Sequence, residues 1–136
     1  MLLFLAVPII IGCSKKREEK PDSLNIFGTI QIDPALKKYT KESDVIFLIA
    51  KPASGGPPVA VIRFTGKNYP YSFNLTNQNL MISETVLDAP LNLSVRVDKD
   101  GEASTKNSGD LIGTCEKNPV SIQSENVILT IQEAIP

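Results

Sequence analysis

Hydrophobic and polar residues alternate with a period of two along most of the chain from residue 25 onward. In the first such segment, residues 25–33, polar residues fall on one side and the other side carries Ile26, Gly28, Ile30 and Ile32. This alternation predicts a β-strand with one buried face. Residues 45–50 form a continuous apolar run instead, which is typical of a strand buried on both faces.

Five further strands are predicted by the same reasoning, at residues 59–66, 71–75, 90–101, 119–123 and 126–134. In the third of these, the predicted inward residues are Leu91, Leu93, Val95 and Val97, and the predicted outward residues are Asn92, Ser94, Arg96 and Asp98. In the last, Val127, Leu129 and Ile131 share one face. Arg63 is expected on an exposed side. Asp33, as N-cap, and Pro34, at the first helical position, predict a single helical turn.

An all-β fold follows from these patterns. No stretch of twelve residues carries the apolar stripe of an amphipathic helix, and turn-forming residues separate the strands. About seven short strands in one domain, residues 25–136, predict an Ig-like antiparallel β-sandwich. The body has neither a cysteine pair nor a tryptophan. The prediction therefore concerns the architecture and not an antibody-type domain.

The N-terminal segment changes abruptly from apolar to charged at Cys13. Residues 1–11 carry no charged side chain and would span about 15 Å as a helix, half of a hydrocarbon core. This length suits a signal peptide better than a membrane span. Residues 10–13, Ile-Ile-Gly-Cys, resemble a bacterial lipobox, in which the cysteine is acylated after cleavage before it.

The predicted organisation is a signal peptide over residues 1–12, a lipidated Cys13 with a flexible tether to residue 24, and the domain. The alternative is an uncleaved hydrophobic tail with an incidental cysteine. Lipid on Cys13 would hold the chain on a membrane of the bacterial envelope, facing the periplasm. Ser14 is not the aspartate associated with inner-membrane retention, which favours the outer membrane.

Composition excludes several classes of function. The formal net charge of −1 offers no basic field for nucleic acid. The chain has no histidine, and Cys13 and Cys115 lie far apart. Neither a zinc site nor a histidine-dependent catalytic site is therefore expected. No nucleophile or phosphate-binding motif is present, so we expect no enzyme, no metal and no cofactor.

Two features invite a chemical interpretation. Acidic residues gather at Asp98, Asp100, Glu102 and Asp110, but Gly101 is misplaced for a calcium loop, so a hairpin turn and a solvated loop are expected. Cys115 is the single thiol of the mature body. Because thiol exchange usually needs a resolving cysteine, a small semi-buried residue is the preferred interpretation.

The segment Ser-Gly-Gly-Pro-Pro is a candidate interaction loop. Gly55 and Gly56 permit unusual backbone angles, and Pro57 and Pro58 then fix an extended geometry. A purely structural connection between strands is the competing interpretation. The residues that would extend a binding surface around this loop are Tyr69, Tyr71 and Met81.

A family resemblance rests on motifs spread over residues 26–135. The first motif joins Gly28, Ile30, Ile32, Pro34 and Leu36. The second is the Gly56-Pro57-Pro58 loop after Ala50-Lys51, and the third comprises Arg96, Gly101, Ala103 and the run Gly109-Asp110-Leu111. In order and spacing the chain resembles the CycH-type Ig-like domain, the C-terminal periplasmic part of bacterial cytochrome c maturation factors.

The resemblance implies a β-sandwich and a role as an assembly or interaction module. Helical repeats that accompany the domain in those factors are absent from this sequence. The expected function is a non-catalytic accessory protein of c-type cytochrome biogenesis or of respiratory complex assembly. Its partner would be apocytochrome c, a maturation factor or a respiratory complex. The alternatives are a structural lipoprotein subunit of an envelope or electron-transport complex, and a small-ligand-binding module.

Overall fold

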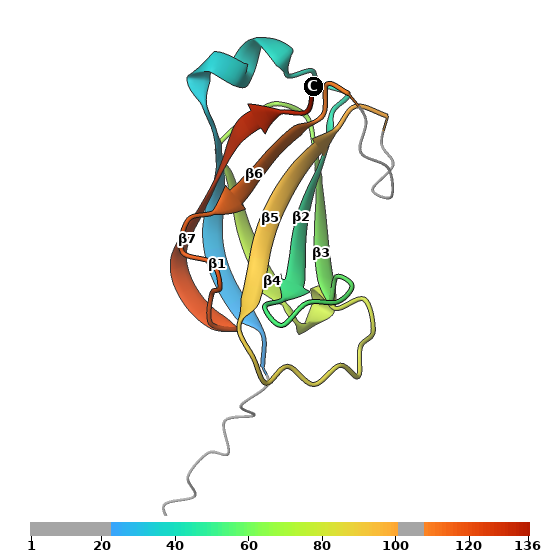
Figure 1. Ribbon diagram of the computed structural model, residues 1–136, viewed down its shortest axis with the longest axis vertical. Coiled ribbons are helices and arrows are strands. Elements are labelled where there is room, and N and C mark those ends of the chain that lie inside the picture. Colours follow the sequence, from blue (N-terminus) through green and yellow to red (C-terminus); the bar gives the residue numbers. More distant parts are fainter. Residues whose placement is uncertain (1–22, 101–107) are drawn as a thin grey trace, which may run out of the picture.

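The computed structural model describes residues 23–100 and 108–136, and within them the regular secondary structure is almost entirely β-strand (Figure 1). The elements are β1 (Asn25–Ile32), η1 (Pro34–Tyr39), β2 (Val45–Pro52), β3 (Ala60–Thr65), β4 (Tyr71–Thr76), η2 (Asn77–Asn79), β5 (Leu91–Asp98), β6 (Leu111–Cys115) and β7 (Gln123–Ala134). Both helices are short 3₁₀ helices. The predicted all-β, Ig-like class is confirmed.

Hydrogen bonds join the seven strands into one sheet, in the order β3-β2-β5-β6-β7-β1-β4. Five of the six pairings are antiparallel. The sixth, between β1 and β7, is parallel, with Ile30 opposite Leu129 and Ile32 opposite Ile131. The sheet is therefore mixed, whereas the sequence predicted antiparallel strands throughout.

The sheet curls so that its two edge strands, β3 and β4, approach each other (Figure 1). At one end the rings of Phe64 in β3 and Tyr71 in β4 lie 5.5 Å apart between centroids. At the other end Ala60 in β3 forms an isolated bridge with Leu80, which follows β4 and η2. The result is a sandwich whose two layers face a common interior.

That interior is one hydrophobic cluster to which all seven strands contribute. Fully buried side chains include Ile30 of β1, Leu48 of β2, Leu75 of β4, Leu93 of β5 and Leu129 of β7. The alternation predicted for β1, β5 and β7 places these residues inward. In β2, Val45–Leu48 are all buried, as the continuous apolar run predicted.

Near the C-terminus one predicted strand is wrong and one strand was missed. Residues 119–122 form no strand, and Gln123 already belongs to β7. Val120 makes a single bridge to Leu91, next to Pro119, which has no backbone donor. The sixth strand is instead β6, which begins at Leu111. Its five residues include Gly113 and are too few to show a clear alternation.

The helical turn after β1 is confirmed. The Asp33 carboxylate accepts a hydrogen bond from the Ala35 N–H at 3.0 Å, and Pro34 occupies the first turn. A short polar N-cap satisfies a donor that the helix itself leaves free. The helix η1 then covers one end of the sheet (Figure 1).

Two glycines occur where the sheet leaves no room for a side chain. A Cβ at Gly28 would lie 2.1 Å from the Val127 carbonyl oxygen and 2.6 Å from the Phe73 ring. A Cβ at Gly113 would lie 2.1 Å from the Thr130 carbonyl oxygen. Both glycines flank register shifts, in the β1–β7 and β6–β7 ladders. Glycine at such bulges lets two backbones approach closely.

The sandwich has two ends that differ in chemistry. The proximal end is the end at which the described chain begins, with Ser23, η2, and the loops at residues 53–59, 80–90 and 116–122. The distal end carries η1, the loops at residues 40–44 and 66–70, and the described residues 99–100 and 108–110, and the C-terminus lies beside it (Figure 1). We use these two names below.

Candidate functional site

The predicted signal peptide, Cys13 and the tether as far as residue 22 lie outside the described residues. Within residues 23–100 and 108–136, neither helix has the length and apolar character to cross a membrane. The interaction residues predicted from the sequence all belong to the described part of the chain. They can therefore be placed on the fold.

The Gly55–Pro58 loop connects β2 to β3 at the proximal end and is largely exposed. Gly55 and Gly56 have φ angles of 103° and 107°, in the region that glycine favours. No atom outside their immediate neighbours lies within 4 Å of a Cβ built on either residue. The glycines therefore serve the turn, and the loop stands away from the body.

The other predicted residues do not form one surface with this loop. Met81 does lie beside it, because its N–H donates to the Val59 carbonyl at 2.9 Å. Tyr69 and Tyr71 belong to the opposite, distal end, across the six residues of β3, a span of about 20 Å. The set predicted from the sequence therefore separates into a proximal and a distal part.

The distal part contains a groove of about 330 Å³ between η1 and the loop that precedes β4. Its lining residues are Gln31, Ile32, Pro34, Lys37, Tyr69 and Pro70. The rings of Tyr69 and Tyr71 pack edge to face at 5.0 Å, and Tyr71 in turn packs against Phe64 at 5.5 Å. Tyr69 is the one ring of this row that lines the groove, and the other two rings hold it in place. We call this feature the distal groove.

The hydroxyl of Tyr69 is buried and has no hydrogen-bond partner among the described residues. Burial, followed by the neighbouring Tyr71 and Asp44, raises the pKa of Tyr69 well above its ordinary value, so the ring stays neutral. The hydroxyl of Tyr71 is satisfied instead: it accepts from the Asn68 N–H at 2.8 Å and donates to the Thr65 carbonyl at 3.3 Å.

We expect Tyr69→Phe to leave the free energy of unfolding unchanged or to raise it by up to about 1 kcal/mol, because the lost hydroxyl makes no hydrogen bond. Tyr71→Phe is the matched control, since it removes two hydrogen bonds and should cost about 1 kcal/mol. Urea unfolding of the three chains measures both effects. A Tyr69→Phe chain less stable than the Tyr71→Phe chain would contradict the assignment.

Charged side chains are buried behind the distal groove, which the strand pattern did not predict. Arg96 and Asp98 were expected to face outward from β5, yet they are only 7% and 0% exposed. The segments at residues 40–44 and 108–110 border the same end of β5 and bring the buried Asp44 and Asp110 with them. Strand alternation identifies a face, but it does not show that loops cover that face.

An ion pair fastens these segments together. The Lys99 ammonium lies 2.8 Å from Asp44 Oδ2 and also donates to the Tyr39 carbonyl at the end of η1. The same Asp44 oxygen accepts from the Lys41 N–H at 2.8 Å, and Asp110 Oδ1 accepts from the Lys99 N–H at 3.0 Å. Lys99 thus links η1, the 40–44 loop and the end of β5, and it fixes one wall of the distal groove.

Asp98 is the exception within this charged group. Its Oδ2 lies 3.6 Å from the Arg96 guanidinium, too far for a hydrogen bond. Its Oδ1 accepts from the Asp100 N–H at 3.0 Å. Burial is the main reason that the pKa of Asp98 rises above its ordinary value, and the neighbouring Asp100 side chain raises it further. The ionised carboxylate is therefore disfavoured in the folded state.

We expect Asp98→Asn to change how stability depends on pH. Because the pKa of Asp98 is higher in the folded state than in the unfolded state, this carboxyl group stabilises the fold fully at pH values below its unfolded-state pKa. That stabilisation is lost as the pH rises through the folded-state pKa. Relative to the asparagine variant, the natural chain should therefore gain stability as pH falls from about 7 towards about 4. Chemical unfolding of both chains at these two pH values measures the difference. A difference in the free energy of unfolding that does not change with pH, or that changes in the opposite direction, would contradict this prediction.

The acidic residues do not assemble a metal site in the described structure. No group of three or more potential ligands meets within residues 23–100 and 108–136. Gly101 and Glu102 of the predicted turn lie outside those residues. Asp98, Asp100 and Asp110 instead accept backbone hydrogen bonds or pair with neighbours at the distal end.

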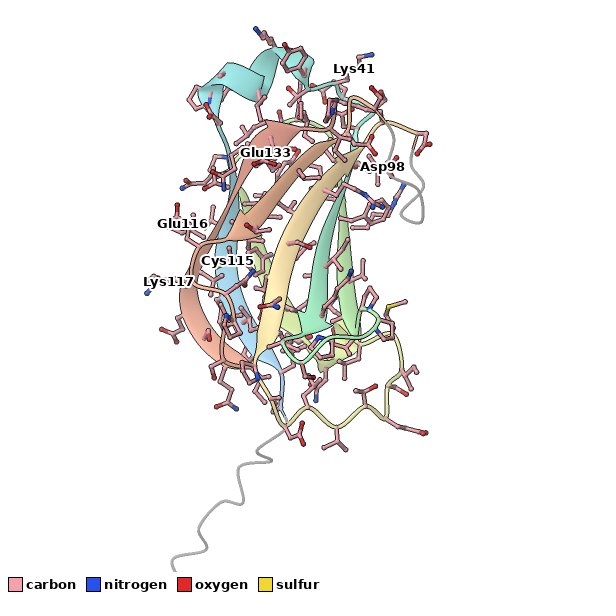
Figure 2. The ribbon with its side chains drawn as sticks, in the orientation of Figure 1. Lys41, Asp98, Cys115, Glu116, Lys117 and Glu133 are labelled. Carbon is pink, nitrogen blue, oxygen red and sulfur yellow. The ribbon has the colours of Figure 1, made fainter. Side chains whose placement is uncertain are left out.

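Cys115 ends β6 and is a free thiol, only 5% exposed, within the hydrophobic cluster. It borders a small pocket of about 180 Å³ between β6 and β7, together with Glu116, Lys117 and Ile128. Figure 2 shows Cys115, Glu116 and Lys117 on the flank of the sandwich, away from Asp98 and Lys41 at the distal end. Its burial agrees with a small core residue.

Comparison with known proteins agrees with this architecture. A protein of Aquifex aeolicus (strain VF5), described as uncharacterized, is 31% identical over 100 residues, which cover 73% of this chain and 66% of the relative. The solved structure of an alternative pilotin from the type II secretion system of Vibrio cholerae superposes with a TM-score of 0.51 at 13% identity. That superposition covers 80% of this chain and 96% of the pilotin chain. At this identity the likeness concerns the fold alone.

Residues 26–132 match the family described as the cytochrome c-type biogenesis protein H Ig-like domain. The match covers β1 to β7, and so it includes every strand of the sheet. This chain therefore belongs to the family of cytochrome c-type biogenesis protein H Ig-like domains.

Proposed function

We propose that this chain is a lipid-anchored, non-catalytic interaction protein of the bacterial envelope that acts in c-type cytochrome biogenesis. The observation that carries the proposal is the family match over residues 26–132. The lipobox-like sequence that ends at Cys13 supports an anchor, and the acylated chain would face the periplasm. The absence of histidine from the sequence favours binding over acid–base catalysis.

The distal groove is the surface that we propose for the partner. Two prolines and the Tyr69 ring offer a flat, weakly polar floor of the kind that accepts extended peptide segments. Lys37 at its margin is exposed and supplies a positive charge. The chemistry therefore favours an extended segment of a partner protein that carries a carboxylate.

The test is capture of partners from detergent-solubilised bacterial membranes by the full chain. Lys37→Glu reverses the charge at the groove, and we expect it to reduce capture of cytochromes or their maturation factors about fivefold. Lys51→Glu is the matched control, because Lys51 is also exposed but lies at the proximal end of β2. Equal capture by both variants would reject the groove as the binding surface.

The composition of the captured material separates the proposed role from its alternatives. Association limited to cells that are making c-type cytochromes supports a role in assembly. Stoichiometric co-purification with a finished electron-transport or envelope complex would assign the chain as a structural subunit instead. Recovery of neither cytochromes nor maturation factors would reject the proposed function. Labelled lipid that is still incorporated after Cys13→Ser would reject the anchor.

A further inference from the structure

The most exposed large hydrophobic side chains of the described residues gather in one loop. Met81, Ile82 and Val86 are 62%, 68% and 70% exposed, whereas no other large hydrophobic residue in the described part of the chain exceeds 50%. All three lie in the loop at residues 80–90, which joins η2 to β5 at the proximal end. We call this segment the apolar loop. Such clustering on a surface marks a contact site more often than scattered single residues do.

The apolar loop is held in place at both sides. At its start Leu80 bridges to Ala60 and Met81 donates to the Val59 carbonyl, while near its end Leu87 is buried in the hydrophobic cluster. Between these attachments the Thr85 N–H and hydroxyl both bond to the Ile82 carbonyl, at 3.0 and 2.8 Å. This turn fixes the backbone at Ile82, so the exposed side chains belong to a hydrogen-bonded segment.

The described chain begins next to the apolar loop. The Leu24 N–H donates to Asn77 Oδ1 at 2.8 Å, and Asn77 opens η2, which leads directly into the loop. Cys13 precedes Ser23 by ten residues, a tether that spans at most about 36 Å when fully extended. A lipid on Cys13 would therefore attach the domain to the membrane through its proximal end, beside the apolar loop.

The charge of the loop indicates how it would meet that surface. It contains two exposed carboxylates, Glu84 and Asp88, and neither lysine nor arginine. Attraction to anionic headgroups is therefore not available, and contact would rest on burial of the apolar side chains at the interface. Exposed lysines are more numerous at the distal end, at positions 37, 38, 41 and 67, than at the proximal end, where Lys51 and Lys117 are exposed outside the apolar loop.

We propose that the apolar loop is a membrane contact, in which Met81, Ile82 and Val86 enter the lipid interface beside the anchor. The loop and the tether then fix the sandwich at two adjacent points. The distal groove is directed away from the bilayer, towards a partner in the periplasm. This orientation rests on the proposed membrane anchor. The contact of the loop with lipid is measured by a separate signal.

Single-tryptophan fluorescence tests the contact, because the natural sequence has no tryptophan. Ile82→Trp places the probe in the apolar loop, and Ile128→Trp is the control on β7, at a residue 50% exposed. Each full chain is purified from membranes and reconstituted into vesicles of phosphatidylethanolamine and phosphatidylcholine. One set of vesicles has brominated acyl chains. The N-terminal segment keeps the chain on the vesicle whether it carries a lipid or remains an uncleaved tail.

The expected result is a shift of the emission at position 82 to shorter wavelength, with quenching by brominated lipid at least about twofold stronger than at position 128. Equal quenching at the two positions overturns the membrane contact. A wavelength shift at position 82 without bromine quenching also overturns it, since the loop then meets protein. Flotation of the chain with the vesicles measures whether the N-terminal segment anchors it to the membrane. A chain that floats without quenching refutes only the loop, and a chain that fails to float refutes the anchor and the orientation together.

Discussion

Gly113→Ala should destabilise the sandwich more than alanine at any other described glycine outside β1. The new Cβ would lie 2.1 Å from the Thr130 carbonyl oxygen, 2.7 Å from its carbonyl carbon and 2.8 Å from Ile131 Cα. All three atoms are backbone, so no rotamer change relieves the clash and β6 must separate from β7. We expect a loss of about 4 kcal/mol, beyond the usual cost of overpacking.

Gly55→Ala is the matched control for this prediction. Gly55 has a positive φ angle, which disfavours alanine, but no atom outside its neighbours lies within 4 Å of the added carbon. We expect a cost of about 1 kcal/mol for the backbone conformation alone. Urea midpoints of the two variants, measured with the natural chain, give both values. Similar midpoints for the two variants would show that the β6–β7 ladder tolerates a side chain at the bulge.

Asp44→Asn should be the second most damaging of the substitutions considered, at about 3 kcal/mol. Asp44 is 2% exposed, and its carboxylate faces the Lys99 ammonium at 2.8 Å. The variant leaves that ammonium without its counter-charge although only 24% of the lysine side chain is exposed. Because Lys99 also binds the Tyr39 carbonyl, the variant should loosen η1 and with it the wall of the distal groove.

A double-mutant cycle distinguishes this ion pair from general packing. We expect the double variant Asp44→Asn/Lys99→Met to cost clearly less than the sum of the two single variants. The cycle is measured by chemical unfolding of the four chains. Additive effects would indicate that Asp44 stabilises the fold through the Lys41 N–H alone, and not through Lys99.

The sequence predicted strands whose pattern of polarity is distinctive. Alternation located β1, β5 and β7, and the uninterrupted apolar run located β2, which is buried over Val45–Leu48. The N-cap at Asp33 located η1, since that signal depends only on neighbouring residues. Local patterns therefore sufficed wherever the environment of a residue was set by its own strand.

Other features depend on contacts between distant segments, which no local pattern records. Arg96 and Asp98 occupy outward positions of β5, yet loops from elsewhere in the sequence cover them. The parallel pairing of β1 with β7 depends on how the sheet curls. In the candidate site, Tyr69 and Met81 lie within twelve positions in the sequence but at opposite ends of the sandwich. The row of rings formed by Phe64, Tyr71 and Tyr69 required the three-dimensional structure.

The position of β1 in the sheet has a consequence for the order in which the domain can assemble during synthesis. β1 leaves the ribosome first, but of its two neighbours one is β7, the last strand to be made. Until β7 emerges, the pair formed by β1 and β4 has no hydrogen-bonded link to the remaining strands. Closing so long a loop is entropically costly and slow. The two parts of the sheet can therefore join only after the last strand of the domain has been made.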